Sequence, residues 1–145
     1  MLAKQTHLAE KTAHLFHLIG QTSRLEILLA IGAGEACVCH LEAWLGYRQA
    51  SISQQLMLLR DGGLVTSRRV GKHIFYALKD PALIGIITQL AALDGFHPED
   101  DLAHLAATAP LPGCVCPVCN PEEADLHTES EPNPAIRGWQ AKAHP

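Results

Sequence analysis

Apolar residues recur at helical spacing in the first part of the chain. Leu8, Leu15 and Leu18 fall on one side of a 3.6-residue wheel. Residues 6–19 are therefore predicted to form an amphipathic helix that ends at Gly20.

Three further helices are predicted before residue 62. Ser23 is expected to cap the first of them, with Glu26 as its capping-box partner and Gly32 at its end. A short helix follows at about residues 39–45. The next, at residues 50–61, ends at a pair of glycines.

The period then changes from helical to alternating. Ile74, Tyr76 and Leu78 are predicted to face one way, and Gly71 and Lys72 lie between two extended segments. This pattern is typical of a β-hairpin.

A long apolar helix is predicted after the hairpin. Asp80 is expected as its N-cap and Pro81 at its first helical position, and apolar residues continue to Leu93. Pro98 is expected to end or kink it, and the acidic residues that follow favour one more short helix over residues 99–107.

Two helices joined by a short turn and followed by a hairpin have the order of a winged helix-turn-helix. The predicted fold is mainly α with a small β-hairpin. Residues 1–107 would form a DNA-binding and dimerisation domain. Residues 108–145 hold seven of the nine prolines and are predicted to be a mostly irregular tail.

The formal net charge of −4 argues against a nucleic-acid partner only when it is taken as a whole-chain sum. Residues 48–79 hold six basic residues and one acidic residue. Residues 108–145 hold five acidic and two basic ones. The basic segment contains the helix predicted at residues 50–61, which would be the recognition helix, and the β-hairpin that follows it, which would be the wing.

On the wheel of residues 50–61, Ile52, Leu56 and Leu59 form the side expected to be buried. The polar side offers amides and hydroxyls that suit base edges and phosphates, and the hairpin adds cations that suit the DNA backbone. An ordinary solvated face is the alternative for the helix alone. The predicted DNA-contacting residues are Arg48, Gln49, Ser51, Ser53, Gln54, Gln55, Arg60, Arg68, Arg69, Lys72 and His73.

The five cysteines cannot all pair within one chain, which favours reduced thiols in a cytoplasmic protein. Cys37 and Cys39 stand at the start of a predicted helix. Because residues i and i+2 lie about 200° apart on a helix, both sulfurs reach one ion only if Cys37 precedes the helix or lies in an unwound turn. Buried apolar roles are the alternative reading for this pair.

Cys114, Cys116 and Cys119 place three more thiols within six residues of the tail, where burial is not expected. Thiolates select soft or borderline ions. Two tail thiols joining Cys37 and Cys39 would give a tetrahedral site, and one would give a trigonal site suited to trivalent arsenic. His40 adjoins the pair and is expected to be a surface residue rather than an auxiliary ligand.

The strings "SRLEILLAI", "ACVCHLEAWLG", "QASISQQLMLLRDGGLV" and "RRVGKHIFYAL" resemble the ArsR/SmtB family of metal-responsive repressors. The resemblance covers residues 23–78 closely and about residues 8–97 loosely. It implies a homodimer through the first and last core helices, with two recognition helices on a palindromic operator. Two apolar outer helices with little else to cover them also favour a dimer.

The resemblance makes Cys37 and Cys39 the ligands carried over from arsenite- and cadmium- or lead-responsive members. The chain departs from both patterns. Glu42 stands where arsenite-responsive members often place a third cysteine, and no cysteine precedes the first helix. The tail is expected to supply the missing thiols, from either protomer.

The resulting hypothesis is a cytoplasmic repressor that binds double-stranded operator DNA and releases it when cadmium, lead, zinc or arsenite binds its cysteines. A redox- or persulfide-sensing repressor of the same fold is the alternative. A dithiol oxidoreductase built on Cys116 and Cys119 lacks the strand-helix-strand context of such enzymes, and Arg68, Arg69 and Lys72 disfavour a metal buffer that does not bind DNA. No enzymatic activity, membrane partner or small organic substrate is expected, and no segment is apolar enough over 18 residues to span a membrane.

Overall fold

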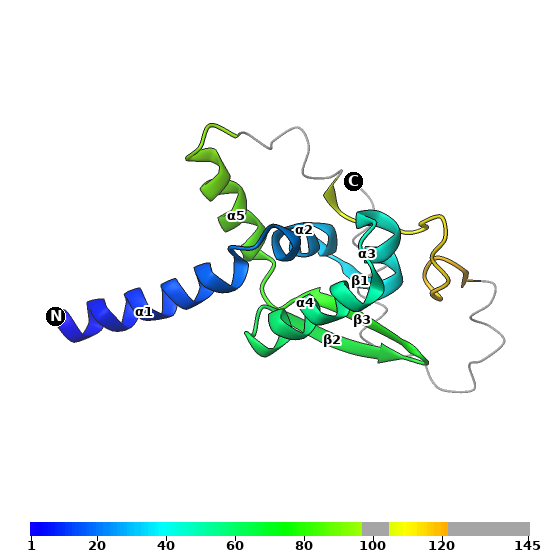
Figure 1. Ribbon diagram of the computed structural model, residues 1–145, viewed down its shortest axis with the longest axis horizontal. Helices are drawn as coiled ribbons and strands as arrows, with labels where there is room; N and C mark the ends of the chain where they lie inside the picture. The colour runs from blue at the N-terminus through cyan, green and yellow to red at the C-terminus, as the bar shows by residue number, and fades with distance from the viewer. Residues whose placement is uncertain (97–104, 122–145) are drawn as a thin grey trace.

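The structure is a computed structural model that describes residues 1–96 and 105–121. Three helices and a small sheet form its body, and two further helices project from it (Figure 1). In chain order the elements are α1 (Leu2–Ile19), α2 (Thr22–Ile31), β1 (Glu35–Cys37), α3 (Val38–Leu45), α4 (Gln49–Asp61), β2 (Val65–Val70), β3 (His73–Leu78) and α5 (Ala82–Ala92).

The helices lie close to their predicted positions, and the predicted cap of α2 is wrong. Gln21, in an extended conformation, is the N-cap of α2, and no side chain caps that end. Glu26 instead accepts a hydrogen bond from the hydroxyl of Tyr47, in the turn between α3 and α4. A long-range partner has replaced the local capping interaction.

The hairpin forms where the alternating pattern predicts it, but it belongs to a three-stranded antiparallel sheet in the order β1-β3-β2. β1 has only three residues, too few to show a period, which is why the sequence pattern missed it. In the sheet Cys37 is opposite Phe75, and Phe75 is opposite Arg68 on the other side.

The two faces of β3 have different surroundings. Of the three residues predicted to face one way, Tyr76 and Leu78 are buried in the main core, whereas Ile74 is 39% exposed. Phe75, which points to the opposite face, is only 2% exposed and packs against cysteines. The pattern therefore identified one buried face of the strand and missed the other.

The helix-turn-helix is built by α3 and α4. Gly46 ends α3 with a φ of 72°, in the left-handed region that glycine adopts without strain. Ile52, Leu56 and Leu59 of α4 are at most 1% exposed, as the wheel predicts. The polar side of α4 is thereby fixed outward.

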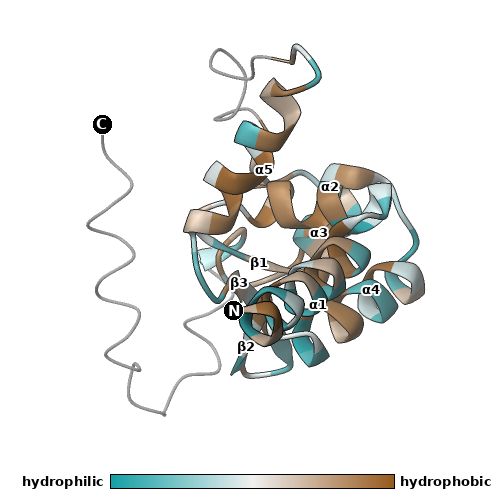
Figure 2. Ribbon diagram, turned by 90° about the vertical axis from the view of Figure 1, so that its left-hand side faces the viewer, coloured by the Kyte–Doolittle hydropathy of each residue, from teal (hydrophilic) through white to brown (hydrophobic). Residues whose placement is uncertain are grey.

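α1 and α5 contribute little to the core of a single chain. Figure 2 shows apolar residues along α5, none of which is buried. Ile86 is 55% exposed, and Leu8 of α1 is 67% exposed. Of the helices described, none is both long enough and apolar enough to span a bilayer. The predicted break at Pro98 and most of the predicted helix at 99–107 lie outside the described residues.

Candidate metal centre

The junction between β1 and α3 brings the first two thiols together. Cys37 ends β1 and is the N-cap of α3, with extended backbone angles of φ −87° and ψ 169°. Cys39 lies in the first helical turn, and its Sγ is 2.8 Å from that of Cys37. The condition predicted for the pair, that Cys37 precedes the helix, is confirmed.

The segment that leads into the tail, residues 105–107, packs against α2 and α3. The backbone N–H of Ala107 donates to the carbonyl of Ala30 at 2.8 Å, and Ala107 is 7% exposed. The indole N–H of Trp44 donates to the carbonyl of Leu105 at 3.1 Å. These contacts direct the residues that follow toward the start of α3.

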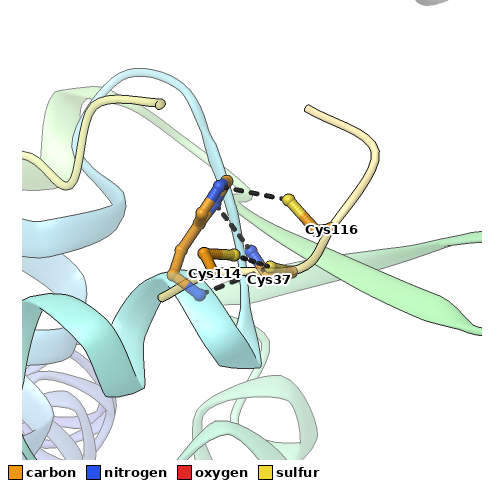
Figure 3. A group of neighbouring side chains, drawn as sticks. Cys37, Cys114 and Cys116 are labelled. Atoms are coloured by element: carbon orange, nitrogen blue, oxygen red, sulfur yellow. Dashed lines mark hydrogen bonds between the residues drawn. The ribbon is translucent and has the colours of Figure 1, made fainter. Parts of the chain in front are cut away.

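Cys114 meets the first thiol pair. Its Sγ lies 2.7 Å from that of Cys39 and 3.9 Å from that of Cys37, across more than 70 residues of chain. Figure 3 shows that the side chains from the tail and from the start of α3 point toward one another. Cys37 and Cys114 are at most 4% exposed.

The other two tail thiols meet His40. Its Nε2 lies 2.9 Å from Sγ of Cys119 and 3.3 Å from Sγ of Cys116. Cys119 also accepts the backbone N–H of Leu111 at 3.2 Å, and the amide of Asn120 donates to the carbonyl of Cys114 at 2.6 Å. The tail therefore forms a compact turn around its sulfurs.

The expectation of a surface role for His40 is wrong, because His40 is 1% exposed. No local pattern predicts this burial, because Cys116 and Cys119, which contact His40, lie 76 and 79 residues later in the chain. The ligand atoms of Cys37, His40, Cys114 and Cys116 all lie within 4.8 Å of one another. Cys114 and Cys116 are themselves buried, contrary to the expectation for a tail.

Burial sets the protonation of this cluster. Desolvation raises the pKa of the thiols of Cys37, Cys114 and Cys119, with the hydrogen bond to Cys39 adding to the effect at Cys37 and Cys114. Desolvation also lowers the pKa of His40. Without an ion, burial therefore favours the neutral forms of Cys37, His40, Cys114 and Cys119.

Phe75 connects the cluster to the wing. It packs against Cys37, Cys114 and Cys116. The guanidinium of Arg68 lies 5.7 Å from the centroid of its ring. Arg68 also pairs with Glu35 at 2.6 Å. Cys37, Phe75 and Arg68 lie side by side on the three strands, so one row across the sheet connects the thiol cluster to the wing.

The residues predicted to contact DNA are in three different situations. In α4 and at its N-cap most are exposed: Arg48, Gln49, Ser51, Ser53, Gln54 and Arg60. Gln55 is half-buried and accepts a hydrogen bond from Arg24 at 3.3 Å. In the wing, Arg69 and Lys72 are exposed, whereas His73 is half-buried and Arg68 is held by Glu35.

A helix-turn-helix followed by a β-hairpin defines the winged-helix class of DNA-binding proteins. Residues 22–67 match the family described as "Bacterial regulatory protein, arsR family". The chain is 38% identical over 94 residues to the biofilm growth-associated repressor of Agrobacterium fabrum, covering 65% of this chain and 80% of that protein.

Two further comparisons agree. The chain is 34% identical over 83 residues to a transcriptional repressor SmtB homolog of Synechocystis sp., covering 57% of this chain and 63% of the relative. The crystal structure of the transcriptional repressor BigR from Xylella fastidiosa is 30% identical, with a TM-score of 0.57 over 64% of this chain and 95% of that one. The chain belongs to the ArsR/SmtB family of transcriptional repressors and is a regulator rather than an enzyme.

Proposed function

We propose that this repressor binds operator DNA in its metal-free form and releases it when a thiophilic ion binds the thiol cluster at the start of α3. The observation that supports this most strongly is the meeting of Cys39 and Cys114 at 2.7 Å. Cys39 lies in the first turn of α3, which is the first helix of the helix-turn-helix, and Cys114 brings a sulfur from the distant tail to the same place.

The donor set fits such an ion. The five thiols and one imidazole of the cluster are soft or borderline donors, and no carboxylate belongs to the four-residue group that lies within 4.8 Å in the described chain. Cadmium, lead, zinc and arsenite share this preference for sulfur, whereas magnesium and calcium prefer oxygen. The proposed ligands are drawn from Cys37, Cys39, Cys114, Cys116 and Cys119. The tail from residue 108 acts as a ligand-donating segment attached to the domain of residues 1–107.

The DNA surface in this proposal is the exposed side of α4 together with Arg69 and Lys72 of the wing. Arg48 and Arg60 lie at the two ends of α4 and suit phosphates on either side of a major groove. Arg68 serves the wing indirectly, because Glu35 and Phe75 hold its guanidinium.

A homodimer is proposed because α1 and α5 leave apolar side chains exposed. Leu15 and Phe16 of α1 are 42% and 48% exposed, and Leu90 and Leu93 are 45% and 84% exposed. A second copy would cover these faces and would place two recognition helices on one operator.

We expect ion binding to release the DNA because the thiol cluster lies at the start of α3. Ion binding requires the tail thiols and the thiols of α3 to be held in one fixed arrangement. α3 is separated from α4 by only three residues, so a shift of α3 reaches the recognition helix. Four thiolates around a divalent ion also leave a net charge of −2 next to a surface that must approach phosphates.

Thiol oxidation or persulfide formation in the same cluster is the second candidate. The specific observation in its favour is that Cys39 has two sulfur neighbours within 2.8 Å, close enough for a disulfide to form when an oxidant such as peroxide accepts the two electrons and the two thiol protons are released.

Fluorescence anisotropy with an operator fragment selected from random duplex DNA tests both candidates. The reduced protein should bind, and at least one of zinc, cadmium, lead or arsenite should weaken binding, an effect that Cys37→Ser and Cys119→Ser should reduce. Arg69→Ala is a matched control that should weaken DNA binding while leaving ion binding unchanged. If only peroxide or polysulfide releases the DNA, the metal proposal is wrong.

A further inference from the structure

His40 is the buried polar residue at the centre of the cluster. In the described part of the chain it is the one polar or charged residue in the buried core, at 1% exposed. Its ring lies between the start of α3 and the tail turn that contains Cys116 and Cys119. A buried imidazole requires partners for both ring nitrogens.

The partner of Nδ1 fixes the position of the ring proton. The backbone N–H of Cys37 donates to Nδ1 at 3.3 Å, and the backbone N–H of His40 donates to Sγ of Cys37 at 3.4 Å, forming a reciprocal cap. A backbone N–H can only donate, so Nδ1 must present its lone pair. The proton of the neutral ring is then on Nε2.

Nε2 faces sulfur, at 2.9 Å from Cys119 and 3.3 Å from Cys116. A histidine that binds a metal through one nitrogen ordinarily donates its other N–H to a carboxylate, a carbonyl or water. If Nε2 of His40 bound an ion, the proton would have to move to Nδ1, where it would meet the N–H of Cys37. Two donors would then face each other in a buried site.

We infer that His40 is not a metal ligand but a hydrogen-bond donor that holds the thiolates of Cys116 and Cys119, so that the ion is bound by sulfur alone. The inference rests on the proposed function and assigns His40 a positioning role within that site. An N–H directed at a thiolate stabilises its negative charge, which matters where four thiolates surround a divalent ion.

The consequence is a preference among ions. An all-sulfur set favours cadmium, lead, arsenite and zinc, whereas a set that includes imidazole would also suit cobalt and nickel. Proximity alone would favour His40 as a metal ligand, because it is one of four residues whose ligand atoms lie within 4.8 Å of one another. The direction of the Cys37 N–H decides between the two readings.

Two measurements on the unaltered 145-residue chain test the inference without any variant. Long-range ¹H–¹⁵N NMR of the reduced, metal-free protein should show His40 with its proton on Nε2. X-ray absorption at the cadmium edge of the cadmium-loaded protein should show sulfur neighbours and no imidazole nitrogen. A proton on Nδ1, or an imidazole nitrogen bound to cadmium, would overturn the inference.

Three variants test the positioning role. His40→Leu should keep the sulfur count and lower cadmium affinity by about 10–100-fold, the range typical of lost outer-shell partners. His40→Gln retains an N–H donor and should recover most of that loss. His14→Gln, on the exposed side of α1, should change nothing. Unchanged cadmium affinity in His40→Leu would contradict the role.

These outcomes are separable from those of the proposed function. The repressor proposal fails if ions bind and DNA affinity does not change. The His40 inference is measured by ring tautomer and coordination, and neither of those depends on DNA.

Discussion

The two halves of the thiol cluster are built in different ways. Cys37 and Cys39 lie where a strand of the sheet becomes a helix, and the backbone of both elements fixes their positions. Cys114, Cys116 and Cys119 lie in a segment without helix or strand, held by individual contacts such as the bond from the backbone N–H of Leu111 to Cys119 and the bond from Asn120 to the carbonyl of Cys114. One half is preorganised by the fold, whereas the other must be ordered against it. The free-energy cost of that ordering makes the tail the natural place for control.

Removal of the tail should have the largest effect. A chain that ends after Thr108 retains the Ala107 bond to Ala30 but loses three of the five thiols. We expect it to bind operator DNA with unchanged affinity and to show no response to cadmium, as measured by anisotropy. A full-length chain with Cys114, Cys116 and Cys119 replaced by serine is the matched control and should behave in the same way. Cadmium-dependent release by the truncated chain would show that the preorganised pair suffices.

Phe75 tests whether the fixed half depends on the sheet. Phe75→Ala removes a ring that is 2% exposed and packs on Cys37, and we expect it to lower the free energy of unfolding by about 3–5 kcal/mol. Chemical denaturation of the reduced protein measures this. Ile74→Ala, at a neighbouring position that is 39% exposed, should change stability far less. Equal losses would mean that the thiol face of β3 is not part of the folded core.

The pH dependence of ion binding tests whether burial keeps the thiols of both halves of the cluster protonated. Burial raises the pKa of Cys37, Cys114 and Cys119, so these thiols retain their protons at neutral pH without an ion. Each thiolate that forms on binding releases a proton, so affinity should rise with pH by up to about tenfold per unit for each proton released. Competition titrations with a chelator of known pH dependence, from pH 6 to 8, measure the slope. A flat profile would mean that the thiols are already ionised.

Substitution of Trp44 should have the smallest effect on cadmium affinity. Trp44→Phe removes one hydrogen bond to Leu105, three residues before the tail, at a position that is 41% exposed, and this bond is worth about 0.5–1.5 kcal/mol at most. We expect cadmium affinity to fall by less than about tenfold. In a Trp139→Phe background Trp44 is the single tryptophan, so its fluorescence should respond when cadmium binds. A response that persists without residues 109–145 would mean that Trp44 does not report the binding of an ion by the tail thiols.

The exposed face and the core of the recognition helix were predictable from local pattern. Ile52, Leu56 and Leu59 repeat at helical spacing, and each is buried as predicted. The hairpin and the position of Cys37 before the helix were also predictable, because turn residues and helix geometry act over a few residues. The sequence by itself thus determined the winged-helix order, the two groups of cysteines and the separation of basic and acidic segments.

The tertiary structure alone decided how those parts meet. Burial of His40 depends on a tail some 75 residues later in the chain, and burial of Phe75 depends on a third strand too short to show a period. Glu26 accepts a hydrogen bond from Tyr47 instead of forming the predicted capping box. Arg68 forms a salt bridge with Glu35 and a cation–π contact with Phe75. Each of these outcomes is a contact between distant residues. Periodicity reports only which face of one element is apolar, and not what comes to cover it.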